Sequence, residues 1–299
     1  MLNLIILLIT GTTNLTLLFV ASHTGSLYVM LLCIVFFSLL NLTIFSLLHE
    51  ATHGVLFPNP NLNYILGLLA ALFFPTSFTL QKVSHLGHHE RNRTRVERFD
   101  MYEPGENRTL KFLQWYGILT GMYYFLSPLM CIVLLIFPKI LSWKILRGTV
   151  ISRQTSAEAM MAPLHGAVLT NIRMETLFTI SIWVIIFSIF DLKFHIVFYC
   201  FLLFGLLWSS IQYLTHAFSP LDIRNGAWNL RFPVIFQMIL LNYNLHLAHH
   251  RNPSLVWYHL GKVIDPQECR PSILQIYARM WKGPIPIHSA TEVYSKLIG

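Results

Sequence analysis

Charged side chains are scarce in this chain of 299 residues: they make up 11% of it, whereas soluble domains carry about 25%. Hydrophobic residues make up 55%, and the mean hydropathy is +0.57. This deficit of charge excludes an ordinary soluble domain and predicts an integral membrane protein. No polar linker divides the sequence, so we expect a single domain over residues 1–299.

Cysteine is sparse as well. The four cysteines lie far apart and form no C-x-x-C pair, which excludes a disulfide scaffold and a zinc ribbon. No lysine or arginine precedes the first apolar run, MLNLIILLIT, although a cleavable signal peptide normally begins with basic residues. We therefore expect residues 3–20 to be a retained membrane segment.

Acidic residues are fewer than basic ones, 13 against 21, which gives a net charge of +8. The basic residues are not interleaved with an exposed aromatic face, so no nucleic acid is expected as a partner. They gather between apolar runs, in residues 82–111 and 138–173, and the positive-inside rule places such segments in the cytosol. These residues are Lys82, Arg91, Arg93, Arg95, Arg98, Arg108 and Lys111, then Lys139, Lys144, Arg147, Arg153 and Arg173.

Several apolar runs approach the roughly 20 residues that a membrane-crossing helix needs. The first two and the last two predict helical hairpins that return to the cytosolic side at His49 and His216. Pro75 lies in the third run, and Gly121 and Pro128 lie in the fourth. A single crossing by either would put successive histidine clusters on opposite faces, so we expect both to be re-entrant or interfacial. The runs are residues 3–20, 26–48, 62–80, 116–137, 174–190 and 194–214.

Histidine is unusually frequent for so apolar a chain, with 14 residues. Spacings of three and four residues place side chains on the same face of a helix. Neutral imidazole suits iron, copper, nickel and zinc, and clustered imidazoles next to a membrane are costly unless a metal compensates. The pattern therefore predicts a metal site. Its candidate ligands are His49 and His53; His85, His88 and His89; His216; and His246, His249 and His250.

The first pair also fits another motif, because HEATH at residues 49–53 is H-E-x-x-H, the signature of zinc proteases. A membrane zinc metalloprotease is therefore the alternative from another enzyme class, and a bis-histidine haem carrier is the non-enzyme alternative. A catalytic zinc takes three protein ligands, so a protease would leave the other histidine groups unexplained. In the favoured interpretation, Glu50 accepts a hydrogen bond outside the metal's ligand shell and orients a ligand imidazole.

The three motifs together resemble the histidine boxes of the membrane fatty acid desaturase superfamily, which includes related hydroxylases and carotenoid ketolases. The boxes are H-x-x-x-H at 49–53 and H-x-x-H-H at 85–89 and 246–250, and the resemblance covers roughly residues 25–265. HHRNPSLVWYHL is similar to the family's HHxxPxxPWxxLP, with Val256 and Gly261 where prolines are usual. QYLTH at 212–216 looks like the family's N-x-x-x-H motif, with glutamine in place of asparagine.

The resemblance implies four transmembrane helices under a cytosolic, histidine-rich cap that holds two irons. His216 would be a direct ligand, and Gln212 would hold a metal-bound water. Dioxygen would be the co-substrate for desaturation of a fatty acyl chain; hydroxylation or ketolation of a lipid or carotenoid is the alternative. The sequence contains no flavin fingerprint, no iron–sulfur cysteine set and no fused cytochrome b5 motif, so a separate ferredoxin or cytochrome b5 type donor is implied.

Overall fold

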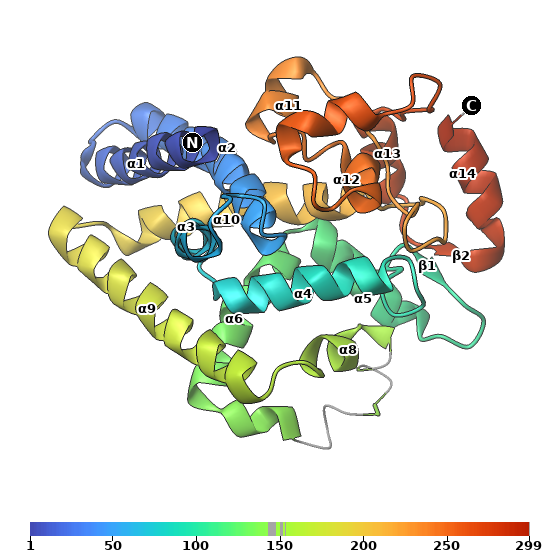
Figure 1. The fold of residues 1–299 in the computed structure, drawn as a ribbon, viewed down its shortest axis with the longest axis horizontal. Coiled ribbons are helices and arrows are strands. Elements are labelled where there is room, and N and C mark those ends of the chain that lie inside the picture. The colour runs from blue at the N-terminus through green and yellow to red at the C-terminus, as the bar shows by residue number, and fades with distance from the viewer. Residues whose placement is uncertain (143–147, 150–151, 153, 299) are drawn as a thin grey trace.

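Four long helices form the framework of the protein, for which the computed structural model describes residues 1–142, 148–149, 152 and 154–298 (Figure 1). They are α1 (Leu2–His23), α2 (Leu27–Thr52), α9 (Gly166–Phe190) and α10 (Phe194–Leu214). Each is long and apolar enough to cross a membrane. The prediction of an all-α membrane protein with four such helices is confirmed, although α9 begins eight residues before the apolar run expected at 174.

The turns of the two hairpins lie side by side. Ser26 caps α2 by accepting a hydrogen bond from Val29 N, and α9 ends at Asp191 in the left-handed conformation. The hydroxyl of Ser22, near the end of α1, accepts a hydrogen bond of 3.2 Å from the backbone N–H of Lys193. The opposite ends of α2 and α10 therefore also lie on one side of the molecule, where the chain continues into the histidine motifs.

The two ambiguous apolar runs do not form straight spans. The first is divided between α3 (Pro60–Leu72) and α4 (Phe78–Arg91), with Pro75 in the break. The second lies in α5 (Arg108–Leu119) and α6 (Met122–Ile136), which meet at an angle of 93°. Gly121 makes this bend at φ +83°, and a Cβ there would lie 3.0 Å from the backbone of Leu206, so the position requires glycine.

The rest of the chain builds a cap from short elements. Met101–Tyr102 (β1) and Ile285–Pro286 (β2) pair in parallel. Lys144, Arg147 and Arg153, three of the basic residues assigned to the cytosol, lie outside the described residues. The short helices are η1 (Pro138–Ser142), α8 (Ala157–Met161), α11 (Val234–Ile239), α12 (His246–Arg251), η3 (Trp257–Val263), α13 (Ile273–Met280), η4 (Ile287–Ser289) and α14 (Ala290–Ile298).

Two hydrophobic cores support the site from different sides. One fills the space between the long helices, with Phe37, Phe45 and Trp208 among its members. The other lies in the cap, where Trp115 and Phe218 are fully buried. Two of the candidate ligands lie where the long helices meet the cap: His49 is in the last turn of α2, and His216 follows the end of α10.

Candidate metal centre

All nine predicted ligand histidines meet in two adjoining clusters. Within each cluster, one ring nitrogen from every member lies within 4.8 Å of the others. The rings of His89 and His250, one from each cluster, stack with their centroids 4.2 Å apart. The five-histidine cluster is His49, His53, His85, His89 and His249, and the four-histidine cluster is His88, His216, His246 and His250.

Each H-x-x-H-H box divides its side chains between the two clusters. On α4, His85 and His89 join the five-histidine cluster, whereas His88 joins the other. On α12 the division is reversed, because His246 and His250 join the four-histidine cluster and His249 joins the larger one. Adjacent helical residues are about 100° apart around the axis, so the neighbouring histidines of a box face different centres. The ring of His85 still lies near both neighbours, with centroids 6.0 Å from that of His88 and 4.8 Å from that of His89.

The Nε2 atoms are spaced as ligands of common ions would be. In the larger cluster, His85 Nε2 lies 2.7 Å from His53 Nε2 and 3.1 Å from His89 Nε2. In the smaller cluster, His88 Nε2 lies 3.2 Å from His216 Nε2. Nitrogens bound to one ion at about 2.1 Å are roughly 3 Å apart, so these separations match the edges of a coordination shell.

Four ring nitrogens of the clusters are buried without a partner among the described residues: Nε2 of His49, Nδ1 of His249, Nδ1 of His246 and Nε2 of His250. A buried polar atom normally has a hydrogen-bond partner, because leaving it unsatisfied costs about 1–3 kcal/mol. Each cluster therefore has two such atoms. Metal ions would satisfy Nε2 of His49 in the larger cluster and Nε2 of His250 in the smaller, so the residues present fit a pair of ions.

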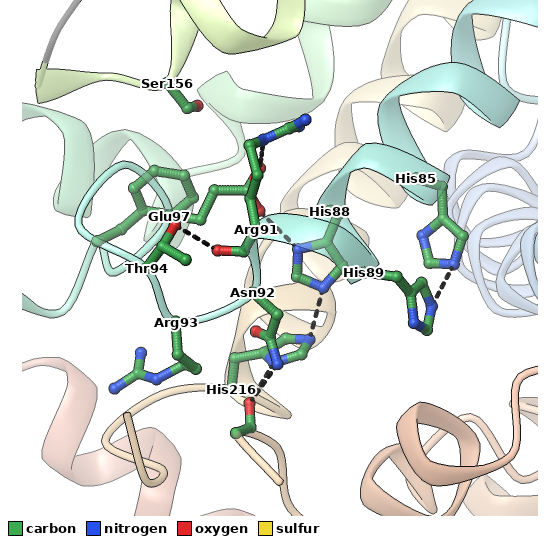
Figure 2. Close-up of polar contacts among 12 residues, drawn as sticks. His85, His88, His89, Arg91, Asn92, Arg93, Thr94, Glu97, Ser156 and His216 are labelled. Carbon is green, nitrogen blue, oxygen red and sulfur yellow. Dashed lines mark hydrogen bonds and ion pairs between the residues drawn. The ribbon is translucent and has the colours of Figure 1, made fainter. Parts of the chain in front are cut away.

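Hydrogen bonds fix the ring orientation of two histidines in the four-histidine cluster (Figure 2). His216 Nδ1 lies 2.9 Å from the carbonyl oxygen of Gly226, which can only accept, so this nitrogen carries the proton. His88 Nδ1 lies 2.7 Å from Oε2 of Glu97, whose other oxygen, Oε1, accepts a hydrogen bond from Arg91 Nε. Each bond turns Nε2 of its ring toward the cluster, where it is available to a metal when the ring is neutral.

Burial lowers the pKa of several imidazoles in the two clusters. It lowers the pKa of His53 to about 4, with a smaller contribution from His88. Burial, followed by neighbouring imidazoles, also holds the pKa of His216, His246 and His249 well below its usual range. Neutral rings near pH 7 are ready to ligate an ion without first releasing a proton.

Comparison with known families decides which family this site belongs to, because the model of the fatty acid desaturase family matches residues 5–282. The chain belongs to the fatty acid desaturase family. No curated protein and no solved structure matches the chain. Family membership implies an oxidoreductase of the membrane that acts on lipids, in agreement with the four long apolar helices and the histidine clusters.

The two polar residues expected outside the ligand shell of this desaturase-family protein have different surroundings. Glu50 Oε2 accepts a hydrogen bond of 3.0 Å from the backbone N–H of Trp257, and none of the described histidines is hydrogen-bonded to it. This bond ties the segment after the third box to the first. Gln212 lies one turn before His216, and its Nε2 is buried without a partner among the described residues.

Sequence reasoning missed the acceptors that orient the rings. Glu97 is only one of several acidic residues in the segment 90–106, and no spacing rule distinguishes it. The second acceptor is the backbone carbonyl of Gly226, which no side chain marks in the sequence. The structure also leaves no room for a side chain at this position. A Cβ there would lie 2.2 Å from the side chain of Arg93 and from the carbonyl oxygen of Asp222. Glycine at 226 lets the chain pass this close to His216.

Proposed function

We propose that this protein holds one iron in each histidine cluster and uses dioxygen to desaturate a fatty acyl chain. The observation that carries the proposal is the division of nine histidines into groups of five and four. Each group exceeds the three protein ligands of a catalytic zinc, and imidazole is a suitable ligand for iron. The unpartnered amide of Gln212 would hold a water that completes the four-histidine site.

The irons, when bound, supply the oxidation of an unactivated C–H bond by dioxygen. The chain's part is to hold nine imidazole rings so that their nitrogens point at two positions, and to exclude water from these positions. Glu97 and the Gly226 carbonyl hold His88 and His216 by their Nδ1 atoms. The bond from Trp257 to Glu50 closes the segment after the third box over the end of α2.

A small cavity borders both clusters and marks where the substrate would approach. Its volume is about 10 Å³, and its walls include His49 of the larger cluster and His246 of the smaller. The ring of Tyr243 lies 5.1 Å from that of His49 and 4.7 Å from that of His246. This space holds little more than one water, so an acyl chain would enter only by displacing lining side chains such as Leu241 or Leu260.

The membrane arrangement and the partners are part of the same proposal. The four long helices would cross the bilayer as two hairpins, with the clusters on the cytosolic face, since the basic segment 82–111 surrounds the second box. Electrons would come from a separate ferredoxin or cytochrome b5 type protein.

Metal analysis and lipid profiling test the proposal together. We expect about two irons per purified chain, no Soret band, and a new double bond in the lipids of a host that expresses the protein. A new hydroxyl or keto group would instead identify a lipid or carotenoid hydroxylase or ketolase. A single zinc, with turnover abolished in Glu50→Gln while the metal stays bound, would identify a protease.

A further inference from the structure

A carboxylate in the long helix α9 is buried against the start of α4. Glu175 is 4% exposed and accepts four hydrogen bonds of 2.6–2.7 Å. No lysine or arginine pairs with it among the described residues, although an ionisable group within a membrane helix is costly and usually has a function. The donors are the hydroxyls of Tyr64, Ser77 and Thr79 and the backbone N–H of Thr79.

The four donors fill all four lone-pair positions of an ionised carboxylate. Ser77 is the N-cap of α4, and Thr79 is in its first turn. The N–H groups of a first turn lack intrahelical partners, and the helix dipole is positive at this end. Glu175 therefore supplies, from another helix, the negative charge and the acceptors that the start of α4 needs.

The first turn is also where α4 is held by packing. Phe78 and Leu80 are the buried residues of this helix, and the positions after Leu80 are half-buried or exposed. The far end of α4 carries His85, His88 and His89, and these reach both clusters. The direction in which α4 leaves its first turn thus determines where three ligands lie.

We infer that Glu175 is a positioning residue that aims α4, and with it one ligand of the smaller cluster and two of the larger. His88 is nine residues beyond Thr79, roughly 14 Å along the axis, so a tilt of about 10° at the first turn would displace it by about 2 Å. Metal–ligand distances tolerate about 0.2 Å. The inference rests on the proposed function, since it takes both clusters to bind metal.

The test is titration of metal-free protein with Co²⁺ and Fe²⁺, followed by ligand-field spectra and dialysis, which needs no turnover. Glu175→Gln keeps the shape but places an amide NH₂ against hydrogen-bond donors. We expect affinity to fall about 10-fold or more at both sites, with an altered Co²⁺ spectrum at saturation, which a loss of stability alone would not produce. Thr179→Val, at another buried position one turn further along α9, is the matched control and should bind metal as wild type does.

Thr79→Val keeps the backbone N–H and removes one of the four hydrogen bonds to Glu175, so it tests the inference even if Glu175→Gln fails to fold. Thr79→Val should lower the metal affinity of both sites, by a smaller factor than Glu175→Gln does. Two metals bound with wild-type affinity in these variants, or loss confined to one site, would overturn the inference while the proposed function stands. Wild-type protein that takes up no metal pair would overturn the proposed function, and the inference with it.

Discussion

Glu97 offers a way to weaken one metal site and spare the other. Its carboxylate is 7% exposed and lies 2.7 Å from Nδ1 of His88, which belongs to the four-histidine cluster. In Glu97→Gln the amide is neutral, so it neither strengthens the His88 ligand nor balances Arg91 as the carboxylate does. Loss of such an acceptor costs about 10–100-fold in metal affinity, which corresponds to about 1.4–2.8 kcal/mol. The five-histidine cluster should keep its affinity.

The assay is iron content after dialysis against graded chelator, together with Mössbauer spectra that resolve the two sites. We expect Glu97→Gln to retain about one iron per chain under conditions in which the wild type retains two. Glu103→Gln is the matched control, because Glu103 lies in the same segment and pairs with Arg98 rather than with a histidine. Equal loss of iron from both sites, or no loss of iron, would refute the conclusion that Glu97 supports only the four-histidine site through His88.

Three further predictions follow from the clusters and their placement. His216→Ala should lower the iron content by about one iron per chain and abolish turnover as completely as the loss of a histidine from one of the boxes. A near-normal iron content would show that His216 is an ordinary interfacial residue. Metal-free protein should lose stability as the pH falls below 6.5, because unfolded His53 then takes up a proton that folded His53, with its pKa lowered to about 4, does not. The effect is roughly 2 kcal/mol at pH 5, and denaturation of His53→Asn should show it removed; an unaltered pH dependence would contradict it. In a Cys269→Ser background, single cysteines at positions 90 and 252 should be labelled from one side of the membrane and position 24 from the other; opposite labelling of 90 and 252 would break the topology.

The sequence was most informative where one physical factor dominates. Mean hydropathy over about 20 residues located the long helices, and the bounds predicted for α10, 194–214, match the structure. The start of α9 was missed because Asn171 and Arg173 interrupt the apolar residues at the beginning of this helix. The eight histidines of the boxes were identified because ligand spacing within a helix is a local property, whereas His216 was assigned through the resemblance of residues 212–216 to a family motif.

The division of the boxes between two centres could not be read from spacing. Helical periodicity places i+3 and i+4 on one broad face, but the 100° between His88 and His89 is resolved only by what packs against each side. That depends on His216 and on α12, which are more than 120 residues away in the sequence. The acceptors Glu97 and Gly226 likewise could be identified only from the structure.

A buried ion pair explains how two segments far apart in the sequence hold His88 and His216 next to each other. Arg93 follows α4 at φ +59°, a conformation that costs a residue with a side chain about 1–3 kcal/mol. Its guanidinium forms two hydrogen bonds with Asp100, both side chains being fully buried, and Asp100 also accepts from Tyr213 OH and Phe218 N. The segment that carries His88 is thereby fastened to the segment that flanks His216. Removing one partner of such a pair leaves the other as an uncompensated buried charge and costs about 3–5 kcal/mol, so Arg93 and Asp100 depend on each other. This ion pair therefore helps to hold His88 beside His216 within the four-histidine cluster.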